Sequence, residues 1–230
     1  MNIKAVTFDV GETLVFYNNP LNWQALYSPA LERVMAVCGT EHLVEADEYA
    51  RQVLTKYNTR VNSREYEVSS NTIFSEILGA WGTSYDKLEA SKQAFFEYFQ
   101  REAKCYDDAQ QTLIALKNCG MKIGVLTDVP YGMDNECALA DLAMIEEYID
   151  VCLTSNDIGY RKPNIAGFRA LEKALDVPSK QIIYVGNEQK DIVGANAAGF
   201  ISVLIEHGDE SEDWGQRFTV RSLSEIWRIL

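Results

Sequence analysis

The sequence carries, near its start, the run Ile3-Lys4-Ala5-Val6-Thr7-Phe8-Asp9-Val10-Gly11-Glu12-Thr13-Leu14. The β-branched and aromatic residues up to Phe8 predict a short strand, and Gly11 supplies the turn chemistry that follows it. In open α/β sheets, ligands bind at the carboxyl ends of the strands. A strand that ends at Asp9 therefore indicates a functional site.

From Cys105 onward, strand-like and helix-like segments alternate. The further strands that we expect are Met121–Thr127, Ile149–Thr154, Gln181–Val185 and Ile201–Ile205. The helices that we expect begin near Asp107, span Cys137–Tyr148 and Ile165–Leu175, and run through Ala195–Ala198. Five strands joined by helices predict an α/β fold, with a Rossmann-like, doubly wound and mostly parallel sheet.

The segment between about residues 20 and 100 has a different pattern. Its apolar residues recur at helical spacing, and we find no convincing buried strand in it. The aromatic set Phe95, Phe96 and Phe99 is expected to form its core. We therefore predict a helical unit at residues 17–101, inserted into an α/β core of residues 1–16 and 102–230.

Composition excludes several classes of function. The chain has 230 residues, of which 47% are hydrophobic, and a net charge of −13. This composition is typical of a globular protein, and the negative charge argues against nucleic acid and anionic membranes as partners. The five cysteines show no CxxC spacing, and no apolar run reaches the length of a membrane span. Since the N-terminus also lacks the features of a secretory signal, we expect a cytoplasmic protein.

Polar residues of different kinds follow four of the predicted strands. They are Asp9 to Thr13, Thr127 and Asp128, Lys162, and the group Asn187, Glu188 and Asp191. Because parallel strands end at one edge of a sheet, we expect these side chains to meet in one crevice. Acids on adjacent strand ends would bind a hard cation such as Mg²⁺, and Thr127 and Lys162 would hold a phosphate group. An aspartate beside these charges is a credible nucleophile.

The same four segments resemble the sequence motifs of the haloacid dehalogenase (HAD) superfamily of hydrolases. The matching residues are Asp9, Thr13 and Leu14 in the first motif, Thr127 in the second, Lys162-Pro163 in the third, and Gly186-Asn187 through Asp191 in the fourth. The long interval between the first two motifs resembles the subgroup with a helical cap inserted there. The resemblance implies a HAD-like core with an α-helical cap domain at residues 17–101.

The resemblance also implies a role for each matching residue. Asp9 would form an aspartyl intermediate, Thr127 would bind the transferring group, and Lys162 would steady both. Mg²⁺ would be held by the Asp9 carboxylate, the Gly11 carbonyl, Asn187, Glu188 and Asp191, although Asp191 could instead cap the following helix. The predicted substrate-binding residues are Thr13, Asp128, Tyr17 and Trp23, with Asp128 offering its backbone N–H. Arg51, Arg60 and Arg64 could meet an anionic substrate, but a solvated helix face is favoured for them.

Two positions depart from the family pattern. Gly11 stands where the family's phosphatases carry the Asp that protonates the leaving group, and Asn187 replaces the first acid of motif four. A lost general acid lowers the rate by about 10²–10⁴-fold.

Three functions remain open after these departures. The favoured one is a Mg²⁺-dependent phosphatase of a small phosphate monoester that recruits another acid, such as Glu12. The second is a hydrolase like the family's metal-independent dehalogenases or its phosphonate hydrolases, which also lack the second Asp. Against it, dehalogenases usually carry an aromatic residue where this chain has Gly11. The third is a degenerate member that binds a ligand or partner without turnover. The substrate and the oligomeric state do not follow from the sequence.

Overall fold

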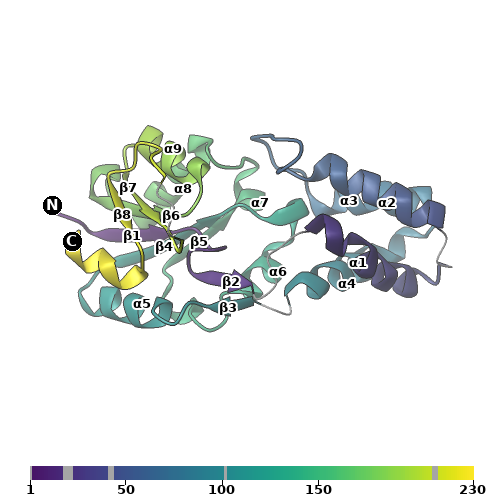
Figure 1. Ribbon diagram of the computed structural model, residues 1–230, viewed down its shortest axis with the longest axis horizontal. Coiled ribbons are helices and arrows are strands. Elements are labelled where there is room, and N and C mark those ends of the chain that lie inside the picture. Colours follow the sequence, from purple (N-terminus) through teal and green to yellow (C-terminus); the bar gives the residue numbers. More distant parts are fainter. Residues whose placement is uncertain (1, 18–22, 41–43, 101–102, 209–211) are drawn as a thin grey trace.

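The computed structural model describes residues 2–17, 23–40, 44–100, 103–208 and 212–230, and only the backbone of residues 23–25 (Figure 1). Its main feature is a parallel sheet of six strands in the order β5-β4-β1-β6-β7-β8. These strands are β1 (Ala5–Phe8), β4 (Lys122–Thr127), β5 (Val151–Thr154), β6 (Ile182–Gly186), β7 (Ile201–Ile205) and β8 (Phe218–Val220). The predicted α/β class is thus confirmed.

Helices cover both faces of this sheet (Figure 1), because alternate strand residues point to opposite sides. On β6, Ile183 and Val185 belong to one hydrophobic cluster with α5 (Ala109–Asn118) and the 3₁₀ helix Leu223–Arg228. Ile182 and Tyr184 belong to another with α8 (Ile165–Leu175) and α9 (Gln189–Ala198). The shorter helices are α6 (Asn135–Ala140), α7 (Ser155–Ile158) and the 3₁₀ turns Pro130–Gly132, Glu146–Tyr148 and Ser179–Gln181. The sheet is therefore doubly wound, as predicted.

Four helices lie together at one end of the molecule (Figure 1). They are α1 (Trp23–Cys38), α2 (Val44–Tyr57), α3 (Ser70–Ala80) and α4 (Leu88–Gln100), with a 3₁₀ turn at Tyr85–Lys87. The predicted aromatic core is confirmed, since Phe95, Phe96 and Phe99 are buried and Phe74 makes edge contacts with the first two. The borders predicted for the cap, at residues 17 and 101, adjoin residues 18–22 and 101–102, which are outside the described part, and they stay predictions.

Three strands were not predicted from the sequence, and one predicted helix is shorter than expected. β8 extends the sheet. The strands β2 (Val15–Tyr17) and β3 (Ala103–Cys105) pair in a separate antiparallel ribbon, and in the sequence one precedes and the other follows the four helices. Each missed strand has only three residues, too few to show a periodic pattern. The helix predicted over Cys137–Tyr148 is interrupted: α6 ends before Asp141, whose carboxylate accepts hydrogen bonds from Tyr17 and Gln100.

None of the helices within the described ranges combines the length and the apolar character that a bilayer span requires.

Candidate active site

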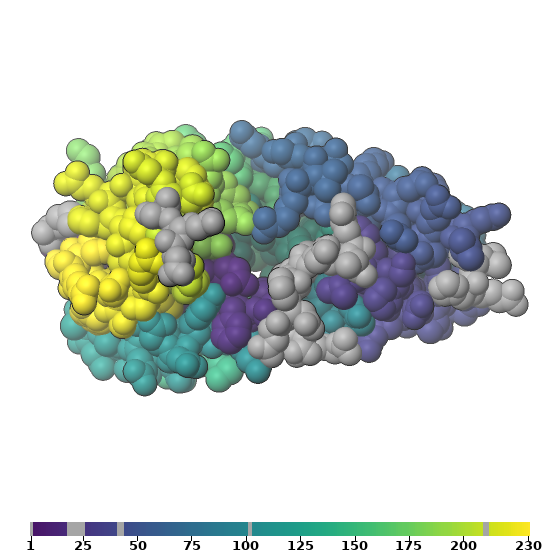
Figure 2. All heavy atoms as spheres, in the orientation of Figure 1, coloured from purple at the N-terminus to yellow at the C-terminus, as the bar shows by residue number. Residues whose placement is uncertain are grey.

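The carboxyl ends of three neighbouring strands meet at one edge of the sheet. β1 pairs in parallel with both β4 and β6, so Asp9, Thr127 and Asn187 leave the sheet close together. All three line a cavity of about 720 Å³. The opposite wall comes from the helical segment, mostly from the turn at residues 57–64 that follows α2. Figure 2 shows the hollow between the α/β part and the helices.

The deepest part of the site is an ion-paired group that we call the inner triad, formed by Asp9, Lys162 and Asp191. Lys162 Nζ lies 2.8 Å from Asp9 Oδ1 and 2.6 Å from Asp191 Oδ1. The side chains of Asp9, Lys162 and Asp191 are 9%, 2% and 0% exposed, respectively. Burial acts to lower the pKa of Lys162, but the charges of Asp191 and Asp9 outweigh it and hold that pKa well above its usual value. Burial raises the pKa of Asp191 to about 6, against the effect of Lys162.

The fold brings Asp191 into this triad through two local features. Asp191 lies in the first turn of α9, where Oδ2 accepts the backbone N–H of Glu188 at 3.0 Å. Asp191 therefore caps the helix start, as the alternative in the sequence analysis proposed, while Oδ1 faces Lys162. Gly186 makes room for it, because a Cβ at that position would come within 2.5 Å of the Asp191 side chain. Close packing against Asp191 thus explains why a glycine stands at this position of the fourth motif.

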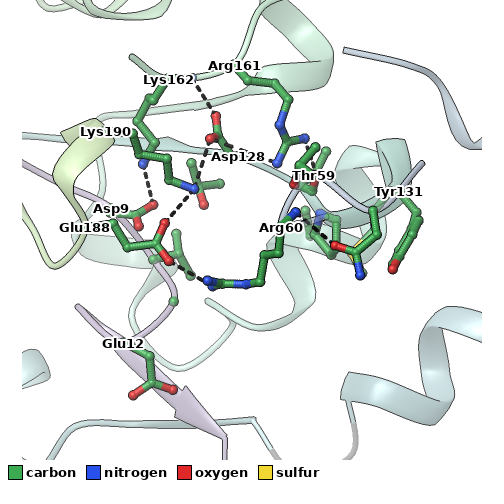
Figure 3. A pocket seen from close by; sticks show the side chains of 18 of the residues that line it. Asp9, Glu12, Thr59, Arg60, Asp128, Tyr131, Arg161, Lys162, Glu188 and Lys190 are labelled. Atoms are coloured by element: carbon green, nitrogen blue, oxygen red, sulfur yellow. Dashed lines mark hydrogen bonds and ion pairs between the residues drawn. The ribbon is translucent and has the colours of Figure 1, made fainter. Parts of the chain in front are cut away.

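A second ion-paired group runs outward from the sheet edge, and we call Asp128, Lys190, Glu188 and Arg60 the outer chain (Figure 3). Lys190 Nζ lies 3.1 Å from Asp128 Oδ2 and 2.8 Å from Glu188 Oε2, and Arg60 Nη2 lies 2.8 Å from Glu188 Oε1. The side chain is 6% exposed for Asp128 at the inner end, 31% for Lys190, 29% for Glu188 and 77% for Arg60 at the outer end. Although burial alone would raise it, Lys190 and Arg60 hold the pKa of Glu188 at about 2. The helical segment thus contributes a charge to the site directly.

Asp128 takes a larger part in the site than the predicted backbone contact. Its Oδ1 accepts the backbone N–H of Lys162 at 3.0 Å. Burial acts to raise the pKa of Asp128, but Lys162, Lys190 and Arg161 together lower it, so this carboxyl is ionised. Asp128 therefore links the inner triad to the outer chain.

A buried acid of the helical segment, Glu67, holds the loops that carry these groups. Its Oε2 accepts hydrogen bonds from Ser155 Oγ, at 2.5 Å, and from Arg161 Nη1. Ser155 Oγ accepts the backbone N–H of Val129 at 3.0 Å, and Arg161 Nη1 also donates to the Val129 carbonyl at 2.7 Å. Glu67 thereby ties the helical segment to the loops after β4 and β5. Nothing in its sequence surroundings indicates this role.

Two predicted residues, Glu12 and Tyr17, line the cavity but interact with other partners. Glu12 has a positive φ of 55° and its Oε2 accepts a hydrogen bond from Tyr106 at 3.0 Å. Figure 3 shows its carboxylate apart from Asp9 and from the outer chain. Tyr17 donates to Asp141 Oδ2 at 2.8 Å, and burial, with the charge of Asp141, raises the pKa of Tyr17. The placement of Glu12 gives little support to its prediction as the replacement acid.

The other predicted residues fall into three groups. Thr127 and Gly11 line the cavity. Thr13 is buried behind the wall, with its hydroxyl 3.3 Å from Asn187 Oδ1. Trp23 begins α1, but its side chain is outside the described part of the chain.

The favoured interpretation of three arginines, a solvated helix face, is confirmed for one of them. Arg51 is exposed on α2 and lines a different hollow. Arg60 and Arg64 instead lie in the turn after α2 and line the cavity.

The carboxylates among the predicted magnesium ligands are not available to bind a metal ion. The predicted ligands are Asp9, Gly11, Asn187, Glu188 and Asp191. Mg²⁺ requires near-octahedral oxygen ligation and usually one or two available carboxylates. Every carboxylate of the set is already ion-paired, with Lys162 in the inner triad or with Lys190 and Arg60 in the outer chain. Within the described residues, no three His, Cys, Asp or Glu side chains are grouped so that they could hold a metal ion. These residues do not fit a resident divalent cation, and we derive no step through one.

Several curated proteins are similar to this chain. Glyceraldehyde 3-phosphate phosphatase of Methanopyrus kandleri is 29% identical over 209 residues, covering 90% of this chain and 85% of the relative. Ribulose-1,5-bisphosphate 5-phosphatase of Halopiger xanaduensis is 29% identical over 120 residues, and the match spans only about half of either protein, 52% and 49%. (S)-2-haloacid dehalogenase 1 of Pseudomonas sp. (strain CBS-3) is 30% identical over 134 residues, 56% of this chain and 57% of the relative.

Solved structures support the fold. A 2-haloacid dehalogenase from Pseudomonas syringae pv. Tomato DC3000 superposes with a TM-score of 0.74 at 21% identity, covering 99% of this chain and 97% of that one. A HAD phosphatase from Thermococcus onnurineus gives 0.67 at 21% identity with the same coverage. The family model described as haloacid dehalogenase-like hydrolase matches residues 3–199. The chain therefore belongs to the haloacid dehalogenase-like hydrolase family.

Proposed function

We propose that this hydrolase cleaves small phosphate monoesters, with Asp9 as the nucleophile. The observation that carries the proposal is the position of the Asp9 carboxylate, at the end of β1, on the cavity wall and 2.8 Å from the Lys162 ammonium. Such an ion pair orients the carboxylate for attack. Asp9 would bond to phosphorus as the bond to the alcohol oxygen breaks. Water would then release inorganic phosphate and restore Asp9.

The charges of the cavity favour an anionic substrate. Its lining includes five basic residues, namely Lys162, Lys190, Arg60, Arg64 and Arg161. The loose transition state of phosphoryl transfer needs mainly positioning and positive charge, which such residues supply. The lining also holds five acids, those of Asp9, Glu12, Asp128, Asp141 and Glu188. The basic residues therefore offset the negative charge locally, in a protein whose net charge is −13.

Magnesium, the location and the partners remain predictions. The resemblance to the family is the only support for Mg²⁺, since the donor set does not fit it. The cysteines, all free thiols, are compatible with the predicted cytoplasmic location. A small phosphorylated metabolite, rather than nucleic acid or a membrane, stays the expected partner.

A second candidate function is nucleophilic displacement of halide by Asp9 without metal. It is favoured by Gly11, because a halide leaves without a proton and needs no general acid. It would form an Asp9 ester that water then hydrolyses. Binding without turnover is the third alternative and predicts stabilisation by a ligand with no product.

The test is hydrolysis of p-nitrophenyl phosphate by the wild type and by Asp9→Asn, each with Mg²⁺ and with chelator. The aryl leaving group departs without protonation, so the assay does not depend on the acid missing at Gly11. We expect turnover that falls by at least about a thousandfold in Asp9→Asn. Alkyl phosphates should react about 10²–10⁴-fold more slowly than aryl phosphates. Turnover no greater than that of Asp9→Asn would overturn the proposal, and 2-haloacids would then be assayed without metal.

A further inference from the structure

Every carboxylate of the two groups is already paired with a fixed cation. The inner triad and the outer chain together hold four carboxylates, those of Asp9, Asp128, Glu188 and Asp191, and three cations, those of Lys162, Lys190 and Arg60. Arg161 adds a more distant contact, with Nη2 4.0 Å from Asp128 Oδ2, but it is bound more closely to Glu67. A divalent cation would have to displace one of these cations from its carboxylate.

Three residues, Gly11, Asn187 and Lys190, make this edge of the sheet less negative. Gly11 and Asn187 leave no carboxylate at two positions where the family pattern has acids. Lys190, immediately before Asp191, adds an ammonium group that lines the cavity. Each change makes the edge less negative, and a less negative edge binds Mg²⁺ less well and an anion better.

Lys190 is placed so that it could contact a ligand. Its side chain is 31% exposed, so its ammonium reaches the cavity without being free in solvent. Its two ion pairs, with Asp128 and Glu188, hold it from both sides and use two of its three donors. Burial acts to lower the pKa of Lys190, but Asp128 and Glu188 outweigh it, so the group carries a positive charge. In Figure 3 its amino group lies between the carboxylates of Asp128 and Glu188.

We propose that Lys190 supplies the positive charge that binds the anionic group of the substrate at this site, in place of a divalent metal ion. Arg60, which reaches Glu188 from the helical segment, fixes the outer carboxylate so that Lys190 stays in position. The inference rests on the proposed function for the identity of the anion, but not for the binding itself. Anion binding and turnover should therefore both persist in chelator.

The experiment is calorimetry with inorganic phosphate in chelator, on the wild type and three variants. Lys190→Met should weaken phosphate binding by about 10–100-fold, the effect of losing one charged hydrogen bond. Lys190→Arg keeps the charge and should retain most of the affinity. Lys180→Met is the matched control, because Lys180 is an exposed lysine that does not line the cavity, and it should bind phosphate like the wild type. Thermal melts establish that each variant is folded.

A Mg²⁺ titration provides the second arm. The wild type and the control variant Lys180→Met should both bind Mg²⁺ weakly and with the same affinity. The double variant Asn187→Asp with Lys190→Met, which restores an acid and removes the ammonium, should bind Mg²⁺ at least about tenfold more tightly.

The outcomes separate this inference from the proposed function. Phosphate binding that requires Mg²⁺, or that is unchanged in Lys190→Met, overturns the inference, even if p-nitrophenyl phosphate is hydrolysed. Phosphate binding that depends on Lys190 in chelator supports the inference, even if no phosphate ester is hydrolysed and the proposed function fails. Turnover that persists in chelator and is lost in Lys190→Met supports both.

Discussion

The inner triad and the outer chain both consist of a lysine between two carboxylates, with Arg60 added to the outer chain, but they differ in their surroundings. Lys162 is 2% exposed and lies between two buried carboxylates, whereas Lys190 is 31% exposed and its partner Glu188 is 29% exposed. Burying an ion pair away from water costs several kcal/mol of desolvation free energy per ion. Removing one partner then destabilises the protein strongly, because the other charge stays buried without a counter-charge. An exposed pair is worth about 0–1 kcal/mol. Removing the cation of the inner triad should therefore destabilise the fold strongly, whereas removing the cation of the outer chain should mainly change ligand binding.

The largest expected effect is on stability, and it compares the two lysines directly. Lys162→Met leaves Asp9 and Asp191 facing each other without a cation, and should lower the free energy of unfolding by about 3–5 kcal/mol. Lys190→Met should lower it by only about 1–2 kcal/mol, because the partly exposed Glu188 keeps Arg60 and the buried Asp128 keeps the backbone N–H of Lys162. Urea denaturation at neutral pH measures both values. Equal losses for the two variants would contradict the distinction between the groups.

A smaller effect comes from crowding the inner triad without removing a charge. In Gly186→Ala the new Cβ would meet the Asp191 side chain at 2.5 Å, and should lower the free energy of unfolding by about 1–3 kcal/mol. Gly79→Ala is the matched control, because Gly79 lies in α3 and a Cβ added there would have no atom within 4 Å. It should be neutral or stabilising by up to about 1 kcal/mol. The midpoints of urea denaturation of the two variants measure this difference. An equal loss of stability in Gly79→Ala would show that the loss in Gly186→Ala does not come from contact with Asp191.

The inner triad could largely be predicted from the sequence, and the outer chain could not. Asp9 follows an apolar strand, and parallel strands bring their carboxyl ends together, so local pattern and fold class suffice to place it near Thr127 and Asn187. Lys162 and Asp191 are placed by their resemblance to family motifs. Their direct ion pair depends on the depth to which Gly186 admits the Asp191 side chain.

The outer chain depends on contacts between segments that are far apart in the sequence. Lys190, in the first turn of a helix, has the pattern of a solvated residue, and Arg60 lies in a turn of the helical segment. Glu67 is separated from Ser155 and Arg161 by about ninety residues, and no periodicity relates them. Such tertiary contacts leave no periodic signal in the sequence. Glu188 was therefore predicted to bind metal, and its ion pair with Lys190 was not predicted.

The smallest effect concerns pH, where the two groups should respond in opposite directions. The folded-state pKa of Glu188, about 2, lies below its ordinary value of 4.5. Its stabilising contribution is therefore complete above pH 4.5 and lost as the pH falls toward 2. The pKa of Asp191, about 6, lies above its ordinary value of 3.8. The folded state then binds the extra proton between pH 6 and 3.8, and stability rises as the pH falls through that range.

Urea denaturation in chelator, at a series of pH values from 7 down to 3, separates the two contributions. Glu188→Gln should cost about 1 kcal/mol at pH 7, a value reduced by solvent screening, and progressively less below pH 4.5. Asp191→Asn should abolish the gain in stability that the wild type shows between pH 6 and 4. If both variants lost stability over the same pH range and with the same sign, the carboxyls of the two groups would share one environment. Burial would then not be what distinguishes the inner triad from the outer chain.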